Sequence, residues 1–206
     1  MNNINIIKPY NPLDKKNIGR NIAEAALRTK VCSLPPEPFA GAGVYIIYYT
    51  GDFPAYRKIS DNNLNNKFNS PIYVGKAVPA GARKGGKIDD IYEGSALYNR
   101  LCEHAASINS VANLKLEDFF CRFLVVDDIW IPLAETLLIE IFQPVWNIIL
   151  EGFGNHDPGK GRYNGKMPPW DCVHEGREWA KKMKPCAYTS EQLIEFIQNF
   201  NSKPVT

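Results

Sequence analysis

The segments Gly43–Thr50, GVYIIYYT, and Pro71–Ala77, PIYVGKA, decide the fold of this chain. Both are dense in β-branched and aromatic residues and end at glycine or loop residues, so the sequence predicts two short strands. A third apolar run, FFCRFLVVD at Phe119–Asp127, predicts another strand, and its length favours burial on both faces. Together the three segments predict one sheet.

Helical patterns surround these strands in the chain. Helix-forming residues with apolar side chains at helical spacing fill Asn17–Lys30, the segment after the N-cap candidate Ser95, Pro132–Gln143 and Thr189–Phe200. The Asn-rich segment 51–70 is predicted to be a polar loop outside the core. A sheet covered by helices is the economical way to bury these apolar faces.

Length and composition describe an ordinary globular protein. The chain has 206 residues, of which 45% are hydrophobic and 22% charged, which predicts one domain with short extensions. No apolar stretch reaches the roughly 18 residues of a membrane span, and the first residues lack the pattern of a signal peptide. The five cysteines form no C-x-x-C pair, which indicates the reducing cytoplasm and argues against a zinc module.

Charge is distributed unevenly along the chain, although the formal net charge is only +2. Segment 54–88 carries seven cations and a single acid, Asp61, whereas segment 111–150 carries two cations and six acids. A local basic loop can hold phosphates while the whole protein stays near neutral. A solvated surface loop with no ligand fits the same charges, so charge alone leaves both readings open.

Two motifs with known chemistry fail on inspection. GNHDPGK at Gly154–Lys160 has the spacing of a phosphate-binding loop, but Gly161 stands where a Ser or Thr must bind magnesium. Asp14-Lys15-Lys16 has the order of a common nuclease site but follows no predicted strand. No G-x-S-x-G marks an acyl-transfer enzyme, and the histidines outside the motifs below are predicted to be ordinary core and surface residues.

A set of short motifs in a fixed order remains. In chain order they are Gly43-Val44-Tyr45, Tyr73-Val74-Gly75, Arg100 with His104 in YNRLCEH, and Glu135 followed by Pro144, Trp146 and Asn147. Over Gly43–Asn147 this order resembles the GIY-YIG nuclease superfamily. The tail GFGNHDPGKGRYNGKMPPWDCVHEGREWA further resembles the type II restriction endonuclease branch that cuts the palindrome CCGCGG.

The resemblance implies an α+β fold with a small, mostly antiparallel three-stranded sheet flanked by helices. It divides the chain into an N-terminal helical arm (1–40), a catalytic core (41–150) and a C-terminal extension (151–206) with a basic loop and a helix. DNA-binding loop insertions are expected in the core at 51–70 and 78–94. The helix at 17–30 is either an arm for dimer or DNA contacts or a cover for the sheet.

The resemblance also implies hydrolysis of phosphodiester bonds in DNA by metal-assisted attack of water. Glu135 is the expected ligand of one divalent metal per active site, Mg²⁺ or else Mn²⁺, since magnesium commonly binds one or two carboxylates and several waters. Arg100 is expected to hold the phosphate oxygens, and His104, one turn later on the same helix, to relay a proton. Asn147 is expected to anchor the site by side-chain hydrogen bonds.

Tyrosine is a poor base at its usual pKa of about 10, so a nearby positive charge must favour the phenolate. Lys76, Arg100 and the metal are the candidates for that charge. Tyr45 is the favoured general base, with Tyr73 bonding the phosphate or the water. Tyr49 shares strand parity with Tyr45 and competes for either role, although packing is its favoured function.

Sequence specificity is expected to come from loops outside the small core. The candidates for reading guanine edges are Arg83, Lys84, Lys160 and Arg162, and those for holding phosphates are Lys87 and Lys166. A palindrome cut on both strands of double-stranded DNA predicts a homodimer. No membrane contact and no nucleotide cofactor are expected. A restriction enzyme also implies a cognate DNA methyltransferase as genetic partner.

Two other functions compete with a restriction endonuclease. A structure-specific repair or recombination nuclease could share the core, but the chain shows no helix-hairpin-helix or zinc-finger module of the kind that targets such enzymes. A catalytically inactive DNA-binding protein would bind DNA without magnesium-dependent cleavage. Incubation of plasmid DNA with the protein and magnesium separates the three.

Overall fold

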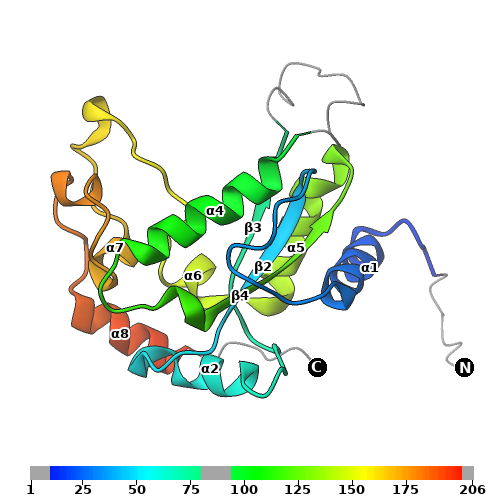
Figure 1. The fold of residues 1–206 in the computed structure, drawn as a ribbon, viewed down its shortest axis with the longest axis horizontal. Coiled ribbons are helices and arrows are strands. Elements are labelled where there is room, and N and C mark those ends of the chain that lie inside the picture. The colour runs from blue at the N-terminus through cyan, green and yellow to red at the C-terminus, as the bar shows by residue number, and fades with distance from the viewer. Residues whose placement is uncertain (1–9, 80–93, 201–206) are drawn as a thin grey trace, which may run out of the picture.

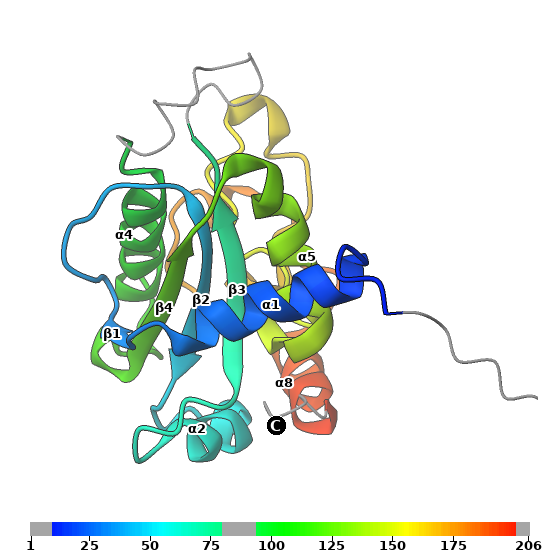
Figure 2. The same cartoon turned by 90° about the vertical axis from the view of Figure 1, so that its right-hand side faces the viewer.

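The computed structural model describes residues 10–79 and 94–200. Within them one antiparallel sheet has the strand order β1–β4–β2–β3, of which Figure 1 labels β2, β3 and β4 and Figure 2 labels all four. The strands are β1 (Cys32–Ser33), β2 (Gly43–Tyr49), β3 (Pro71–Ala77) and β4 (Phe119–Val125). The predicted α+β fold and its three strands are confirmed as β2, β3 and β4. The two-residue β1 adds a fourth strand, because Cys32 and Ser33 pair with the outer edge of β4.

Helices flank this sheet, and the four predicted ones are confirmed within two residues of their expected bounds. The helices are α1 (Lys15–Arg28), α2 (Arg57–Asn63), α4 (Ala96–Asn109), α5 (Ile131–Phe142), α6 (Val145–Ile148), α7 (Pro169–Val173) and α8 (Ser190–Asn199). Short 3-10 turns lie at η1 (Pro54–Tyr56), η3 (Leu116–Asp118), η4 (Asp128–Trp130), η5 (Lys160–Arg162) and η6 (Ala180–Lys182).

Caps set several helix ends. The side chain of Asp14 accepts a hydrogen bond from the backbone N–H of Lys16 at 2.8 Å, so α1 begins before the predicted Asn17. Thr189 and Gln192 form a reciprocal capping box at the start of α8. Ser95 occupies the N-cap position of α4, but its hydroxyl accepts from the Asn99 side chain and makes no cap bond to the backbone.

The prediction of a polar loop over 51–70 is wrong, because this segment forms η1 and α2 and enters the core. Tyr56, before the start of α2, and Asn63, at its end, are both fully buried. The Asn63 amide donates to the carbonyls of Tyr49 (2.9 Å) and Ser70 (2.8 Å), and its oxygen accepts from the Ser70 N–H at 2.8 Å. A buried amide with its hydrogen bonds satisfied escapes the penalty that makes asparagine unusual in a core.

The central strand β2 divides two apolar clusters, since alternate side chains on a strand point to opposite faces. Tyr45, Ile47 and Tyr49 face the cluster under α4 and the C-terminal segment (residues 151–200), whereas Val44, Ile46 and Tyr48 face the cluster under α1 and α5. All residues of β2 are buried. The prediction that Phe119–Asp127 is buried on both faces is therefore wrong, because in β4 only Phe119 and Cys121 are buried. The strand that is buried on both faces is β2.

The helix α1 lies across one face of the sheet beside α5 (Figure 2). Its small residues Gly19, Ala23 and Ala26 are buried, and a Cβ added at Gly19 would overlap the side chain of Leu137 on α5. Arg122 of β4 donates to the carbonyls of Leu27 and Thr29 near the end of α1. The helix α1 therefore covers the sheet, which is one of the two roles expected for it. Its contact with DNA or with a second copy of the chain stays a prediction.

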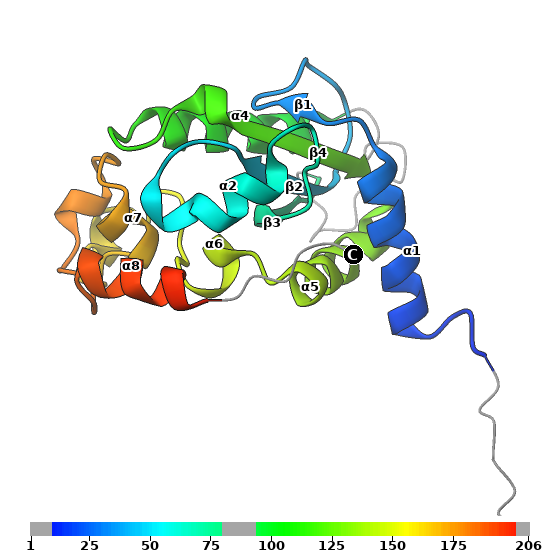
Figure 3. The same cartoon turned by 90° about the horizontal axis from the view of Figure 1, so that it is seen from below.

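The C-terminal segment gathers α7 and α8 at the end of the molecule far from α1 (Figure 3). It shares the larger apolar cluster with α4 and α6, so it is part of the same core. Within the described residues no helix is both long and apolar enough to cross a membrane. All five cysteines lie in the described residues and are free thiols.

A buried hydrogen-bond network ties this segment to the core through His174. The Asn113 side-chain oxygen accepts from His174 Nδ1 at 2.9 Å, which leaves Nε2 to accept from the Tyr56 hydroxyl at 2.6 Å. The Tyr56 oxygen in turn accepts from the Trp146 indole N–H at 2.8 Å. Burial lowers the pKa of His174 to about 3, so the ring stays neutral in the folded protein.

Candidate active site

Two tyrosines meet where β2 pairs with the edge strand β3. Tyr45 lies opposite Gly75, and its ring centroid is 6.2 Å from that of Tyr73. A Cβ at Gly75 would overlap the Tyr45 ring, so this position needs glycine to leave room for the phenol. Tyr45 of the first strand motif therefore lies next to Tyr73 and Gly75 of the second.

The helix α4 brings His104 directly onto Tyr45. The Tyr45 hydroxyl and His104 Nε2 are 2.5 Å apart, and His104 is 1% exposed. The Phe153 ring stacks on the imidazole with centroids 4.4 Å apart and an angle of 18° between the planes. Burial, with smaller contributions from the charges of Arg100, Arg177 and His156, holds the pKa of His104 well below 6.5, so the ring is neutral.

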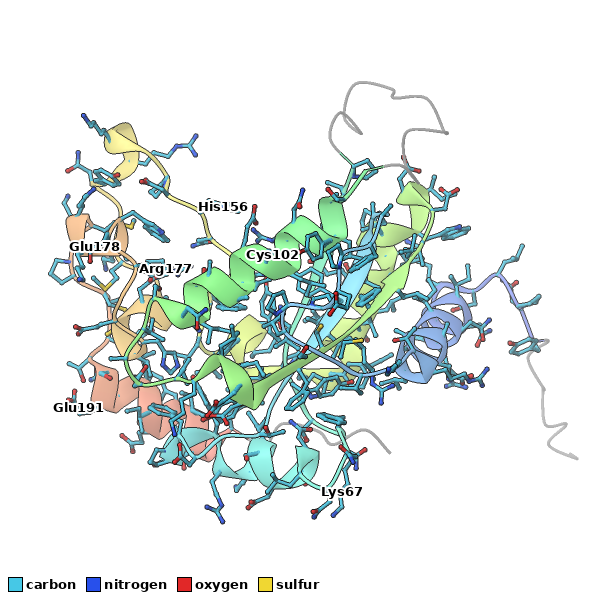
Figure 4. All side chains as sticks on the ribbon, in the orientation of Figure 1. Lys67, Cys102, His156, Arg177, Glu178 and Glu191 are labelled. Carbon is cyan, nitrogen blue, oxygen red and sulfur yellow. The ribbon has the colours of Figure 1, made fainter. Side chains whose placement is uncertain are left out.

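Arg100, one turn before His104, presents its guanidinium next to the same two tyrosines. Its Nη2 donates to the Gly154 carbonyl at 2.5 Å, and its Nη1 donates to Glu103 at 2.9 Å and to His156 Nε2 at 2.5 Å. Figure 4 shows His156 close to α4. Burial works against the charged form, but the neighbouring tyrosines and Glu103 outweigh it and raise the pKa of Arg100.

Both phenols at the site are neutral in the free protein. Burial raises the pKa of Tyr45 well above 10, Tyr73 adds to the rise, and Arg100 offsets it only in part. Burial likewise raises the pKa of Tyr73, against the opposing charge of Arg100. The negative charge of Glu135 reaches both phenols and further disfavours the phenolates. A base at Tyr45 must therefore pass on its own proton as it receives another.

Glu135 on α5 and Lys76 on β3 form an ion pair at the same edge of the sheet. Lys76 Nζ and Glu135 Oε2 are 2.5 Å apart, and the Glu135 side chain is 21% exposed. A partly exposed carboxylate suits magnesium, which takes few protein ligands and keeps its waters. Within the described residues no cluster of three or more His, Cys, Asp or Glu side chains could hold a metal, so Glu135 would act with water and phosphate oxygens.

Asn147 on α6 occupies the outer edge of β3. Its side-chain oxygen accepts from the Val74 N–H at 2.8 Å, and its amide donates to the Val74 carbonyl at 2.8 Å. Two such bonds replace those that a neighbouring strand would make. Asn147 thus fixes the strand that carries Tyr73 and Lys76.

Tyr49, the competing tyrosine, lies away from this group. Its hydroxyl accepts from the Phe53 N–H at 2.9 Å, and its ring packs against Tyr56 and Phe119. Burial raises its pKa to about 12. The site therefore brings together Tyr45, Tyr73, Arg100, His104, Lys76, Glu135 and Asn147, and Tyr49 is separate.

The predicted DNA-contacting cations fall into two groups. Arg83, Lys84 and Lys87 lie outside the described residues. Lys160, Arg162 and Lys166 are exposed on a loop that extends from the body beside α4 (Figure 1). The Tyr163 hydroxyl bonds Asp157 at 3.0 Å, and Lys182 lies over the Tyr163 ring, so this loop has internal support.

Three residues at the site have no counterpart in the sequence prediction. Glu103 and His156 contact the Arg100 guanidinium, and Phe153 stacks on His104. Of these three, only Glu103 could have been predicted from the sequence, because an acid three residues after an arginine lies on the same helix face. His156, predicted as an ordinary surface histidine, is exposed, but it contacts Arg100.

Acid is expected to destabilise the protein through its two buried histidines. An unfolded histidine has a pKa near 6.5, whereas the folded pKa values of His104 and His174 lie below this, at about 3 for His174. Below pH 6.5 the unfolded chain binds more protons, so stability present above that pH is lost as the pH falls. Between pH 7 and pH 5 the expected loss from His174 is about 2 kcal/mol, and His104 adds a loss in the same direction.

Urea unfolding at pH 7, 6 and 5 measures this loss. His174→Gln removes one titrating group, so its stability should depend on pH less steeply over this range. Equal stability of the unmodified protein at pH 7 and pH 5 would contradict the assignment of neutral, buried rings.

Comparison with known proteins adds one finding to this geometry. A family model described as the Eco29kI GIY-YIG domain matches residues 37–201, which is more than half of the chain. The match covers the strands β2, β3 and β4, the site and the C-terminal segment, and it begins after α1 and β1. The comparison with curated proteins found no match.

Proposed function

The chain belongs to the Eco29kI GIY-YIG family of restriction endonucleases, and from this premise we propose that it cuts both strands of DNA at the GC-rich palindrome CCGCGG. Membership makes it a site-specific deoxyribonuclease with DNA as its substrate. The observation that carries the chemical part of the proposal is the contact of Tyr45 with His104, 2.5 Å apart, next to the Arg100 guanidinium.

Glu135 is the proposed ligand of one Mg²⁺ ion, with Mn²⁺ as the alternative. Its partial exposure, and its negative charge, which acts on both phenols, support this assignment. A bound ion of this kind stabilises the negative charge that grows on the scissile phosphate and the leaving oxygen. The bond from Lys76 Nζ to Glu135 Oε2 holds this carboxylate in place.

Proton transfer in the proposed reaction runs through Tyr45 to His104. As water attacks phosphorus, one of its protons passes to the Tyr45 oxygen while the hydroxyl proton of Tyr45 passes to His104 Nε2. Neutral His104 with its own proton on Nδ1 can accept it and becomes an imidazolium. A phosphate bound to Arg100 offsets one of the charges that lower the pKa of His104, so substrate makes the histidine a better acceptor.

The two remaining polar groups of the site hold the phosphate in this scheme. The Arg100 guanidinium binds its oxygens and stabilises their charge in the transition state. Tyr73 donates a hydrogen bond to the phosphate or to the attacking water. Both side chains lie on the same side of the sheet as Tyr45, which supports their acting on one phosphate.

Recognition is proposed to come from the basic loops and from a second copy of the chain. Lys160 and Arg162 would read guanine edges together with Arg83 and Lys84, and Lys166 and Lys87 would hold phosphates. A two-fold homodimer presents one site to each strand of the palindrome. The proposed setting is the cytoplasm, where a cognate DNA methyltransferase protects the host's own sites.

A plasmid with a single CCGCGG site tests this function. In Mg²⁺ the protein should convert the plasmid to one linear product with both ends inside the palindrome, as read by end sequencing. A chelator should abolish cutting because it removes the metal ion, and added Mg²⁺ should restore it. A plasmid without the site is the control and should stay intact.

Other results would contradict the proposal in distinct ways. Preference for branched DNA would indicate a repair or recombination nuclease, and binding without cleavage would indicate an inactive DNA-binding protein. A solution mass equal to the 23.2 kDa of one chain, in the presence of the palindrome, would contradict the homodimer.

A further inference from the structure

Arg177, in the C-terminal segment, uses every N–H of its guanidinium. Nε and Nη2 donate to the two carboxylate oxygens of Asp171 at 2.6 and 2.5 Å. The other three N–H groups donate to the carbonyls of Gly152 (2.9 Å), Phe153 (3.0 Å) and Asn155 (3.1 Å). Both charged residues are buried, with Arg177 6% and Asp171 2% exposed.

The loop held in this way is the loop that touches the active site. Of the four residues from Gly152 to Asn155, Arg177 binds the carbonyls of three, and the remaining carbonyl, that of Gly154, accepts from Arg100 Nη2 at 2.5 Å. A Cβ at Gly154 would come within 2.6 Å of the Tyr73 hydroxyl and 3.1 Å of Arg100 Nη2, so the backbone passes directly against both groups.

The same loop also places an aromatic ring in the site. Phe153 stacks on His104 and meets the Tyr73 ring edge-on, with centroids 5.0 Å apart. A shift of this loop would therefore move the contacts of Arg100, His104 and Tyr73 at once.

We propose that Arg177, oriented by Asp171, is a positioning residue for the cleavage reaction, which it serves by fixing the loop Gly152–Asn155 and through it the Arg100 guanidinium. The proposal rests on the nuclease function proposed above. Figure 4 shows Arg177 on the C-terminal segment. Because Arg177 is buried and all its donors are used by Asp171 and the loop, it acts through the loop and not on DNA.

The hydrogen bonds of Arg177 require the planar guanidinium group of arginine. The Trp170 and Trp179 rings lie 4.6 and 4.7 Å from its guanidinium carbon, which restricts its movement. Lysine has one nitrogen with three donors, so it cannot serve Asp171 and three carbonyls together. Arg177→Lys therefore keeps the positive charge but loses the planar set of N–H donors that these hydrogen bonds need.

Single-turnover cleavage and DNA affinity of Arg177→Lys, measured separately, form the first test. Cleavage should slow by about 10- to 100-fold, the size expected from misplacing a catalytic group by around an ångström. The Kd for DNA should change less than about threefold, since the lost contacts do not face DNA. Asp171→Asn, which removes only the charge of the partner, should show the same pattern with a smaller loss and serves if Arg177→Lys does not fold.

Asn113→Ala is the matched control. Asn113 bonds His174 and the Val173 carbonyl in the same segment, and among the described residues no hydrogen bond joins its side chain to the loop Gly152–Asn155. The control should lose thermal stability and keep the cleavage rate. An equal fall in rate for Asn113→Ala would mean that destabilisation of the segment alone explains the effect, and the proposal would be overturned.

A double-mutant cycle with Arg100 decides whether Arg177 acts through it. In an Arg100→Ala background, Arg177→Lys should slow cleavage by less than about threefold more, because the group it positions is gone. Full multiplication of the two losses, or a wild-type rate for Arg177→Lys, would overturn the proposal.

A readout without cleavage separates this proposal from the nuclease function. The NMR signal of the Arg100 guanidinium should shift in Arg177→Lys and stay in place in Asn113→Ala. If the unmodified protein cuts no DNA, the proposed function is wrong. An unmoved Arg100 signal would overturn the positioning role whether or not the protein cuts.

Discussion

Glu135→Ala should abolish cleavage while DNA binding survives. The change removes the single carboxylate proposed to hold the metal ion, and the several kcal/mol that such an ion contributes in the transition state correspond to a loss of about a thousandfold or more in rate. Binding should stay the same or tighten, because a negative charge beside the phosphate is gone. Single-turnover cleavage and gel-shift titration measure the two quantities.

Glu140→Ala is the matched control, since Glu140 is an exposed acid on the same helix, α5. It should cut at the wild-type rate. Loss of the ion pair with Lys76 costs at most about 1 kcal/mol at a partly exposed site, so Glu135→Ala should fold. Wild-type cleavage by Glu135→Ala would remove the metal assignment, and an equal loss in Glu140→Ala would point to the helix and not to the carboxylate.

Tyr45→Phe should slow cleavage by about 10²- to 10⁴-fold, the usual contribution of general acid–base catalysis. The variant keeps the buried ring and removes only the hydroxyl that contacts His104 at 2.5 Å. The water then has no oxygen at that place to take its proton, and His104 loses its link to the reaction. Cleavage rates with saturating DNA measure the effect.

Tyr49→Phe provides a control on the same strand and the same face. Its hydroxyl accepts from the Phe53 N–H, so the variant should lose about 1 kcal/mol of stability and keep its cleavage rate. If Tyr49→Phe were the slow variant and Tyr45→Phe cut normally, the two roles would have to be exchanged.

The outline of the fold could be predicted because the strands and most helices carry strong local patterns. β2 and β3 are short β-branched and aromatic runs, and α8 begins at a capping box. α2 could not be predicted, because its place in the core depends on Asn63 bonding backbone groups of Tyr49 and Ser70. Local propensity favours a loop for such a segment, and only the tertiary contact reverses it.

Local sequence patterns likewise predict only part of the candidate site. Strand parity puts Tyr45 and Tyr49 on one face, but four residues of strand separate them by about 13 Å, and a sequence pattern does not say which end of the strand faces the chemistry. His156 and Arg177 follow the core motifs by many residues, and no periodicity relates them to Arg100. Their contacts arise from the path of the C-terminal segment back to α4.

The two bonds of Asn147 to Val74 have a consequence for self-association. An open strand edge is a template for adding a strand from another molecule, which leads to continuous intermolecular sheets and aggregates. With an amide side chain on the middle of that edge, a second copy cannot extend the sheet there without first displacing it. The proposed homodimer therefore cannot form by strand addition at the middle of β3, which leaves this edge, with the proposed site residues Tyr73 and Lys76, free for DNA.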